Sequence, residues 1–118
     1  MVAGYATELG TMGADWWLYY LNELPHYYIS KAEAHEKGWN NLRGNLAEVA
    51  PNTMIFGGIY SNKKKVLPHK ENRIWYEADI NYTGGYRNKQ RIVFSNDGLI
   101  FVTYDHYETF IVIIGEGM

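Results

Sequence analysis

Several charged side chains with complementary chemistry lie close together in the second half of the chain. Glu77 and Asp79 alternate with apolar residues, and this period of two indicates a half-buried β-strand. The sequence YTGG at residues 82–85 predicts a turn, after which a second strand returns from Arg91. A strand can bury only one residue parity, so both acids, Arg91 and the nearby Arg87 are predicted to share the opposite face. This face could bind an anion, or it could be an exposed surface with cross-strand ion pairs.

The buried parity of this predicted hairpin consists of even-numbered positions. They are Ile74, Tyr76, Ala78 and Ile80 in the first strand, and Ile92 and Phe94 in the second. The basic charge of the chain is concentrated in the same region. Residues 1–60 hold three Lys and Arg against six Asp and Glu, whereas residues 61–91 hold eight against three, in a chain of net charge −2. A local excess of positive charge favours a phosphate or polyanion partner, and a solvated surface is the alternative for the run at residues 63–65.

Length and composition place the chain among ordinary globular domains. The 118 residues predict one domain over 1–118, with a poorly defined start at 1–10 and a flexible tail at 115–118. The absence of cysteine excludes disulfides and thiolate metal sites, and the four histidines lack ligand spacing, so we expect no metal and no cofactor. No apolar run is long enough to span a membrane. The first residues lack the basic start of a signal peptide, so the segment is expected to be mature or cut from a longer protein.

Three helices are predicted in the first half of the chain. The second opens with a capping box at Ser30 and Glu33 and stops at Gly38, and Lys31 in its first turn is either incidental or held for an anion. The third covers residues 45–50, with Asn45 as its cap. The first runs from about Thr11 to about residue 22, and its core residues are expected to be Met12, Trp16, Trp17, Tyr20, Leu21 and Leu24.

Strands dominate the second half. A strand with a bulge is predicted over residues 54–60, where Gly57 and Gly58 interrupt an apolar run. After the hairpin, a tight turn at residues 95–98 leads to strands over 99–104 and 109–114. Helices followed by antiparallel strands indicate an α+β fold, with three N-terminal helices packed on one face of a twisted antiparallel sheet of four to five strands.

The order of these elements and several motifs together resemble a known family. The motifs are GW at residues 38–39, GNLAEVAP at 44–51, IYSN at 59–62, WYEADINYTGGYRNKQR at 75–91 and DHYETF at 105–110. From about Leu24 to Ile114 the chain resembles the small, guanyl-preferring bacterial ribonucleases of the barnase and binase type. The resemblance implies the microbial ribonuclease fold and an endoribonuclease that needs no metal. The family cleaves single-stranded RNA by transphosphorylation to a 2′,3′-cyclic phosphate, which is then hydrolysed.

The resemblance also implies a role for each residue that matches the family's site. Glu77 matches the general base and His106 the general acid, while Arg87 and Arg91 match the pair that binds the phosphate. Lys31 matches a lysine that reaches the same phosphate. Two further matches lie beside them: Tyr107, the aromatic next to the substrate base, and Asp79, the carboxylate that supports the arginines. Arg73 and Asp97 match a structural ion pair.

Base recognition is where the sequence departs from the family. Tyr60, Ser61, Asn62 and Lys63 occupy the loop that reads guanine, and Lys64 stands where the family has a glutamate that accepts from the base. Lysine donates hydrogen bonds and accepts none, so we predict weakened or altered guanine preference. A shift of the loop by one residue that brings Glu71 into the pocket would restore an acceptor. Asn22 also replaces a histidine that ends the family's first helix.

The partners follow from the resemblance. RNA is the expected substrate, and a small acidic inhibitor or immunity protein of the barstar type is a potential partner of a chain that is otherwise expected to be monomeric. A bacterial protein secreted or delivered out of the producing cell is expected, and a toxin domain at the end of a larger protein is one form of it. The alternative from another class is a non-catalytic module that binds RNA or a partner on the same scaffold.

Overall fold

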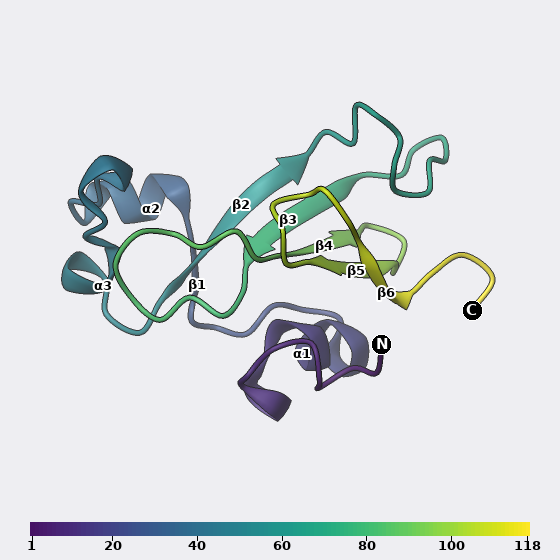
Figure 1. Ribbon diagram of the computed structural model, residues 1–118, viewed down its shortest axis with the longest axis horizontal. Helices are drawn as coiled ribbons and strands as arrows, with labels where there is room; N and C mark the ends of the chain where they lie inside the picture. The colour runs from purple at the N-terminus through teal and green to yellow at the C-terminus, as the bar shows by residue number, and fades with distance from the viewer.

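The computed structural model describes residues 1–118, and its elements follow the predicted order of helices before strands (Figure 1). The α+β fold class is confirmed. None of the helices is long and apolar enough to cross a membrane. The elements are the 3-10 helix η1 (Gly10–Met12), α1 (Ala14–Leu21), β1 (Tyr28–Ser30), α2 (Lys31–Glu36), the 3-10 helix η2 (Asn41–Arg43), α3 (Leu46–Val49), β2 (Met54–Tyr60), β3 (Trp75–Asp79), β4 (Arg91–Ser95), β5 (Ile100–Thr103) and β6 (Ile111–Ile114).

The six strands form one sheet in the order β1-β2-β3-β4-β5-β6. All neighbouring strands are antiparallel except β1 and β2, which pair in parallel from Tyr28 opposite Met54 to Ser30 opposite Phe56. The predicted count of four to five strands was therefore too low. The strand β1 is only three residues long and pairs with a distant segment, so it leaves no periodic pattern in the sequence.

The hairpin of β3 and β4 has the predicted register. Tyr76 lies opposite Phe94 and Ala78 opposite Ile92, so even positions pair with even positions, and Asp79 lies opposite Arg91. The connection is longer than predicted, because the strands end at residues 79 and 91 and the YTGG turn is only part of the loop over residues 80–90. Ile74 precedes β3 and is 40% exposed, so its predicted place in the core is wrong.

Two main cores hold the helices to the sheet. In the first, Ala14 and Leu18 of α1 pack with Ala78, Ile92 and the other even-numbered residues of the central strands. In the second, the residues of α2 and α3 pack around the β1 and β2 end of the sheet, through Ala34, Trp39, Leu46 and Ile55. In Figure 1, α1 accordingly lies below the central strands, while α2 and α3 lie together at one end. The segment between α2 and α3, which includes Trp39, therefore packs against the β1 and β2 end of the sheet.

The buried face of α1 differs from the prediction. Met12, Tyr20 and Leu21 are about half exposed, with exposed fractions of 54%, 58% and 48%. The buried residues of the helix are instead Ala14, Asp15 and Leu18. Small side chains at the start of α1 let the helix approach the sheet closely, and the aromatic residues pack on one another at its margin, as in the Trp16 and Tyr20 pair.

The predicted helix caps are partly confirmed. The Ser30 hydroxyl accepts the N–H of Glu33 at 3.1 Å, and Gly38 adopts the left-handed conformation with φ +102° that ends a helix. Asn45 precedes α3, but its side chain makes no capping bond. Its amide instead accepts the N–H of Asn40 at 2.8 Å and donates to the carbonyl of Gly38 at 3.1 Å. Asn45 therefore joins the segments between α2 and α3.

The ion pair expected between Arg73 and Asp97 is present, with an Nε–Oδ2 distance of 2.9 Å. The same guanidinium also contacts Glu116 in the last residues of the chain, where Nη2 lies 3.2 Å from Oε2. The flexibility of residues 115–118 and the looseness of residues 1–10 stay predictions.

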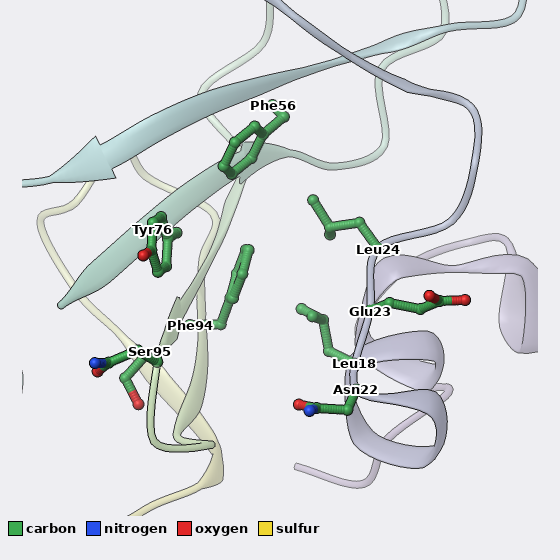
Figure 2. A pocket seen from close by; sticks show the side chains of 9 residues that line it. Leu18, Asn22, Glu23, Leu24, Phe56, Tyr76, Phe94 and Ser95 are labelled. Atoms are coloured by element: carbon green, nitrogen blue, oxygen red, sulfur yellow. The ribbon is translucent and has the colours of Figure 1, made fainter. Parts of the chain in front are cut away.

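A cleft of about 370 Å³ opens between the end of α1 and the sheet. Figure 2 shows Phe56, Tyr76 and Phe94 on its sheet side, with Leu18 and Leu24 facing them from the helix side. Tyr76 and Phe94 have the parity of the buried core residues, so this cleft lies on the opposite face from Glu77 and Asp79.

A buried carboxylate fastens the N-terminal segment to α1. Asp15 is fully buried, and its Oδ2 accepts the N–H groups of Gly4 at 2.6 Å and Ala6 at 3.0 Å. We expect Asp15→Ala to lower the free energy of unfolding by about 1–3 kcal/mol, because it leaves buried N–H groups without an acceptor. Urea denaturation followed by circular dichroism measures this change. The exposed Glu8→Ala is the matched control, expected to stay within about 0.5 kcal/mol of wild type. An equal loss in both variants would contradict the proposed role of the carboxylate.

Candidate active site

Asp79 is the centre of the charged cluster on the β3 and β4 hairpin. Its side chain is 1% exposed, and both of its oxygens are bonded to arginines. Arg87 donates from Nε to Oδ2 at 2.8 Å and from Nη2 to Oδ1 at 2.7 Å, and Nε of Arg91 lies 3.1 Å from Oδ1. The two parallel bonds of Arg87 fix the plane of its guanidinium. The hydrogen bond with Asp79 also raises the pKa of Arg87, so this group stays charged.

Arg91 holds the loop over residues 80–90 in place. Its Nη1 donates to the carbonyls of Asn88 and Gln90, both at 2.7 Å. The Asn88 amide completes the loop, since Nδ2 donates to the carbonyl of Ile80 at 2.9 Å and Oδ1 accepts the N–H of Gln90 at 3.0 Å. Sequence reasoning missed Asn88. The available signal was an asparagine, a common turn residue, directly after Arg87 and before Arg91.

Trp39 supports the other arginine from the second core. The Arg87 guanidinium carbon lies 5.8 Å from the centre of the Trp39 ring, which is a cation–π distance. Trp39 is 6% exposed, and the ring of His35 from α2 stacks on it at 4.7 Å. The tryptophan packs in the second core. It also gives Arg87 a rigid surface.

His106 and Tyr107 lie in a turn between β5 and β6 where both residues are left-handed, with φ of +55° and +74°. The carboxylate of Asp105 braces this turn by accepting from Thr109, from its N–H at 2.9 Å and its hydroxyl at 2.6 Å. These bonds lower the pKa of Asp105 to about 2. The backbone N–H of His106 donates to the carbonyl of Lys89 at 2.9 Å. The turn is therefore joined to the loop that carries Arg87.

Tyr107 connects this turn to Glu77 on β3. Its hydroxyl donates to Oε2 of Glu77 at 2.8 Å. Burial is the largest cause that raises the pKa of Tyr107, and this hydrogen bond is the second. The phenol therefore remains protonated and can donate. The ring of Tyr107 stacks on Tyr60 at 4.8 Å with an angle of 12° between planes, and the His106 ring meets it edge-on at 4.9 Å. Four predicted site residues thus form one continuous cluster.

Three predicted site residues also open onto one cleft. Arg87, Arg91 and His106 line a hollow of about 500 Å³ together with Asn41, Asn88 and Lys89. These side chains come from η2, from β4, from the loop over 80–90 and from the turn after β5. A carboxylate, an imidazole and two guanidinium groups on adjoining elements are suited to acid–base chemistry at a bound phosphate.

Lys31 joins this region less closely. It is exposed and begins α2 directly after Ser30, the last residue of β1. Ser30 lies opposite Phe56 of β2, and Phe56 lies opposite Ala78 of β3. Lys31 therefore comes one residue after the position of β1 that is aligned, across β2, with Ala78 between Glu77 and Asp79. No hydrogen bond or ion pair connects Lys31 to these two acids.

The predicted base-binding residues line a different cleft. Tyr60, Ser61, Asn62 and Lys63 border a hollow of about 360 Å³, and Lys65 and His69 lie in the same lining. The Asn62 amide is buried and bonds to the backbone of Leu67, so it shapes the loop and only its backbone is left for a ligand. Neither Lys64 nor Glu71 lines this cleft, and no carboxylate does.

Comparison with known proteins gives the family. A family model described as ribonuclease matches residues 19–113. A ribonuclease of Heyndrickxia coagulans is 50% identical over 97 residues, which cover 82% of this chain and 88% of that protein. Ribonucleases of Bacillus intermedius and Bacillus pumilus are also 50% identical over 97 residues, but the match covers only 59% of their length.

The chain belongs to the ribonuclease family. The resemblance and the enzyme class predicted from the sequence are therefore confirmed.

The geometry around Asp79 gives a direct test. Removing its carboxylate leaves Arg87 and Arg91, whose side chains are only 17% and 5% exposed, without their shared counter-charge. We expect Asp79→Ala to lower the free energy of unfolding by about 3–5 kcal/mol, as for other broken buried pairs. Urea denaturation measures the change, with the exposed Glu108→Ala as a control that should remain near wild type. A stable Asp79→Ala variant would mean that the arginines do not depend on this residue.

Proposed function

We propose that this ribonuclease is an endoribonuclease that cleaves single-stranded RNA without a metal ion, by transphosphorylation. The observation that carries the proposal is the cleft shared by Arg87, Arg91 and His106, with Glu77 joined to it through Tyr107. Family membership supplies the substrate class, RNA. The groups in and beside the cleft match what attack of a ribose 2′-oxygen on the adjacent phosphorus requires.

The steps follow from the chemistry of these side chains. Glu77 takes the proton of the 2′-hydroxyl as general base, and the 2′-oxygen forms a bond to phosphorus. Arg87 and Arg91 stabilise the charge that develops on the phosphate oxygens, and Lys31 adds a further cation. The bond from phosphorus to the 5′-oxygen breaks, and protonated His106 gives that oxygen its proton. In the second stage, His106 takes a proton from water that attacks the cyclic phosphate, and Glu77 returns a proton to the 2′-oxygen.

Several contacts support these roles. Asp79 keeps the Arg87 guanidinium in one plane, so its charge is oriented before a phosphate arrives. The Tyr107 phenol orients the Glu77 carboxylate through Oε2. The rings of Tyr60 and Tyr107 stack on each other, and a base would stack on the outer face of one of them.

Base selection is proposed to be weaker than in the family. The loop with Tyr60, Ser61 and Lys63 offers backbone N–H groups to a base, but no carboxylate lines its cleft. Guanine presents two donors, at its ring N–H and amino group, and lysine cannot accept from them. Stacking then contributes most of the base affinity, and stacking discriminates poorly between bases.

The wider biology is proposed from the family. The chain would fold as one domain over residues 1–118 and act as a monomer. A small acidic inhibitor would bind across Lys31, Arg87, Arg91 and His106, and the enzyme would be secreted or delivered out of a bacterial cell, in one form as a toxin domain. The rival function is a non-catalytic RNA- or partner-binding module. The retained acid, base and cations favour catalysis.

Variants of the proposed acid and base test the mechanism. We expect Glu77→Ala and His106→Ala each to lower the rate of RNA cleavage by about 10²–10⁴-fold in excess EDTA, since each removes a proton-transfer group. A fluorogenic RNA substrate measures the rate. The exposed Glu108→Ala and His26→Ala are matched controls expected to cleave like wild type. Intact RNA with the wild-type chain would contradict the enzymatic function, and inhibition by EDTA would contradict the metal-free mechanism.

The loop substitution gives a separate prediction for specificity. We expect Lys64→Glu to raise guanine preference by about 1–3 kcal/mol, or roughly 5- to 150-fold. Residue 64 does not line the cleft itself, but Lys63 and Lys65 on either side of it do, so a carboxylate at this position lies beside the base site and supplies an acceptor for both guanine donors. The ratio of kcat/KM values on the sixteen dinucleoside phosphates measures this preference. Lys70→Glu makes the same change of charge nearby and should leave the ratios unchanged. A wild-type chain that already prefers guanine strongly would overturn the prediction.

A further inference from the structure

The Glu77 carboxylate is confined between Tyr107 and the backbone of β2. On one side its Oε2 accepts the Tyr107 hydroxyl. On the other side lies Gly57, which has no side chain. A Cβ atom at residue 57 would lie 2.6 Å from Oε1, 2.9 Å from Cγ and 3.2 Å from Cδ of Glu77. The first two distances are shorter than nonbonded carbon contacts allow, so the carboxylate occupies space that exists only because residue 57 is glycine.

Backbone conformation does not explain this glycine. Gly57 is absent from the residues with positive φ, so no left-handed backbone requires glycine at this position. The neighbouring Gly58 shows the opposite case, with φ of +84° and open space where its Cβ would lie. The two glycines therefore meet different requirements. Gly58 permits the backbone to turn, and Gly57 leaves room for the side chain of Glu77.

A β-bulge brings the backbone of Gly57 to this position. The register of β2 against β3 shifts from Phe56 opposite Ala78 to Gly58 opposite Glu77, which leaves Gly57 as the extra residue. A bulge bends its strand and redirects nearby groups. The extra residue of this bulge, Gly57, is also the residue that lies against the carboxylate of Glu77.

We propose that Gly57 is a positioning residue for catalysis, which sets the place of the Glu77 carboxylate by leaving space for Oε1 while Tyr107 holds Oε2. The proposal rests on the proposed function, in which Glu77 is the general base. A larger residue at position 57 would displace the carboxylate from the 2′-hydroxyl, and it would do so without removing any charged or hydrogen-bonding group from the site.

A double-mutant cycle of Gly57→Ala and Glu77→Ala tests this proposal. With a dinucleoside phosphate substrate, we expect Gly57→Ala to lower kcat by roughly 100-fold, the effect of a misplaced catalytic group, with KM little changed. In the Glu77→Ala background, adding Gly57→Ala should not lower the residual rate further, because the displaced group is already absent. Gly98→Ala is the matched control. Its φ of +97° strains an alanine in open space at a distant turn, so it should lower the melting temperature and leave kcat unchanged.

Stability supplies a second readout that does not depend on activity. Gly57→Ala should lower the melting temperature of the wild-type chain, and this loss should disappear in the Glu77→Ala background, where the atoms that Cβ would meet are gone. Wild-type kcat in Gly57→Ala, or equal losses of rate and stability in both backgrounds, would overturn the proposal. Full activity of Glu77→Ala alone would instead refute the proposed function, so the two failures are distinguishable.

Discussion

The structure depends on the buried carboxylate of Asp79. A buried charge is tolerated only when it is paired and hydrogen-bonded, and here two arginines from one loop and the next strand supply the pairing. This requirement draws the loop over residues 80–90 against the end of β3. Arg91 and Asn88 then fix the loop internally, and the carbonyl of Lys89 receives the N–H of His106. The position of the proposed acid thus follows from the charge balance at Asp79.

The site is assembled from irregular segments on a rigid sheet. Glu77, Asp79, Arg91 and the base-binding Tyr60 lie on strands, whereas Arg87 and His106 lie in loops. Each loop is held by groups outside the reaction, such as Trp39 beneath Arg87 and Asp105 beside the left-handed turn. Left-handed residues other than glycine cost free energy, and the hydrogen bonds that Asp105 accepts from Thr109 offset that cost. Because these loops are held in place, Arg87 and His106 are already positioned when a substrate binds. Such preorganisation lowers the barrier to reaction.

Local patterns in the sequence predicted the features that depend on neighbouring residues. The alternation around Ala78 gave the register of the hairpin, and Ser30 with Glu33 gave the start of α2. Features set by distant contacts were missed. The buried face of α1 includes Asp15, which accepts hydrogen bonds from the backbone of the N-terminal segment, and β1 pairs in parallel with the distant β2. The Gly-Gly pair predicted a bulge, yet only the geometry separates the role of Gly57 from that of Gly58. The site residues were predicted through family resemblance, while periodicity alone left two interpretations.

The central claim is attack by a 2′-oxygen without a metal ion, and one substrate series tests it directly. Four DNA oligonucleotides, each with one ribonucleotide of a different base at the same position, are incubated with the wild-type chain in excess EDTA. We expect cleavage only at the bond after the ribonucleotide, and a 2′,3′-cyclic phosphate as the first product, identified by mass spectrometry. Cleavage at deoxyribonucleotide bonds, or a first product without the cyclic phosphate, would contradict it.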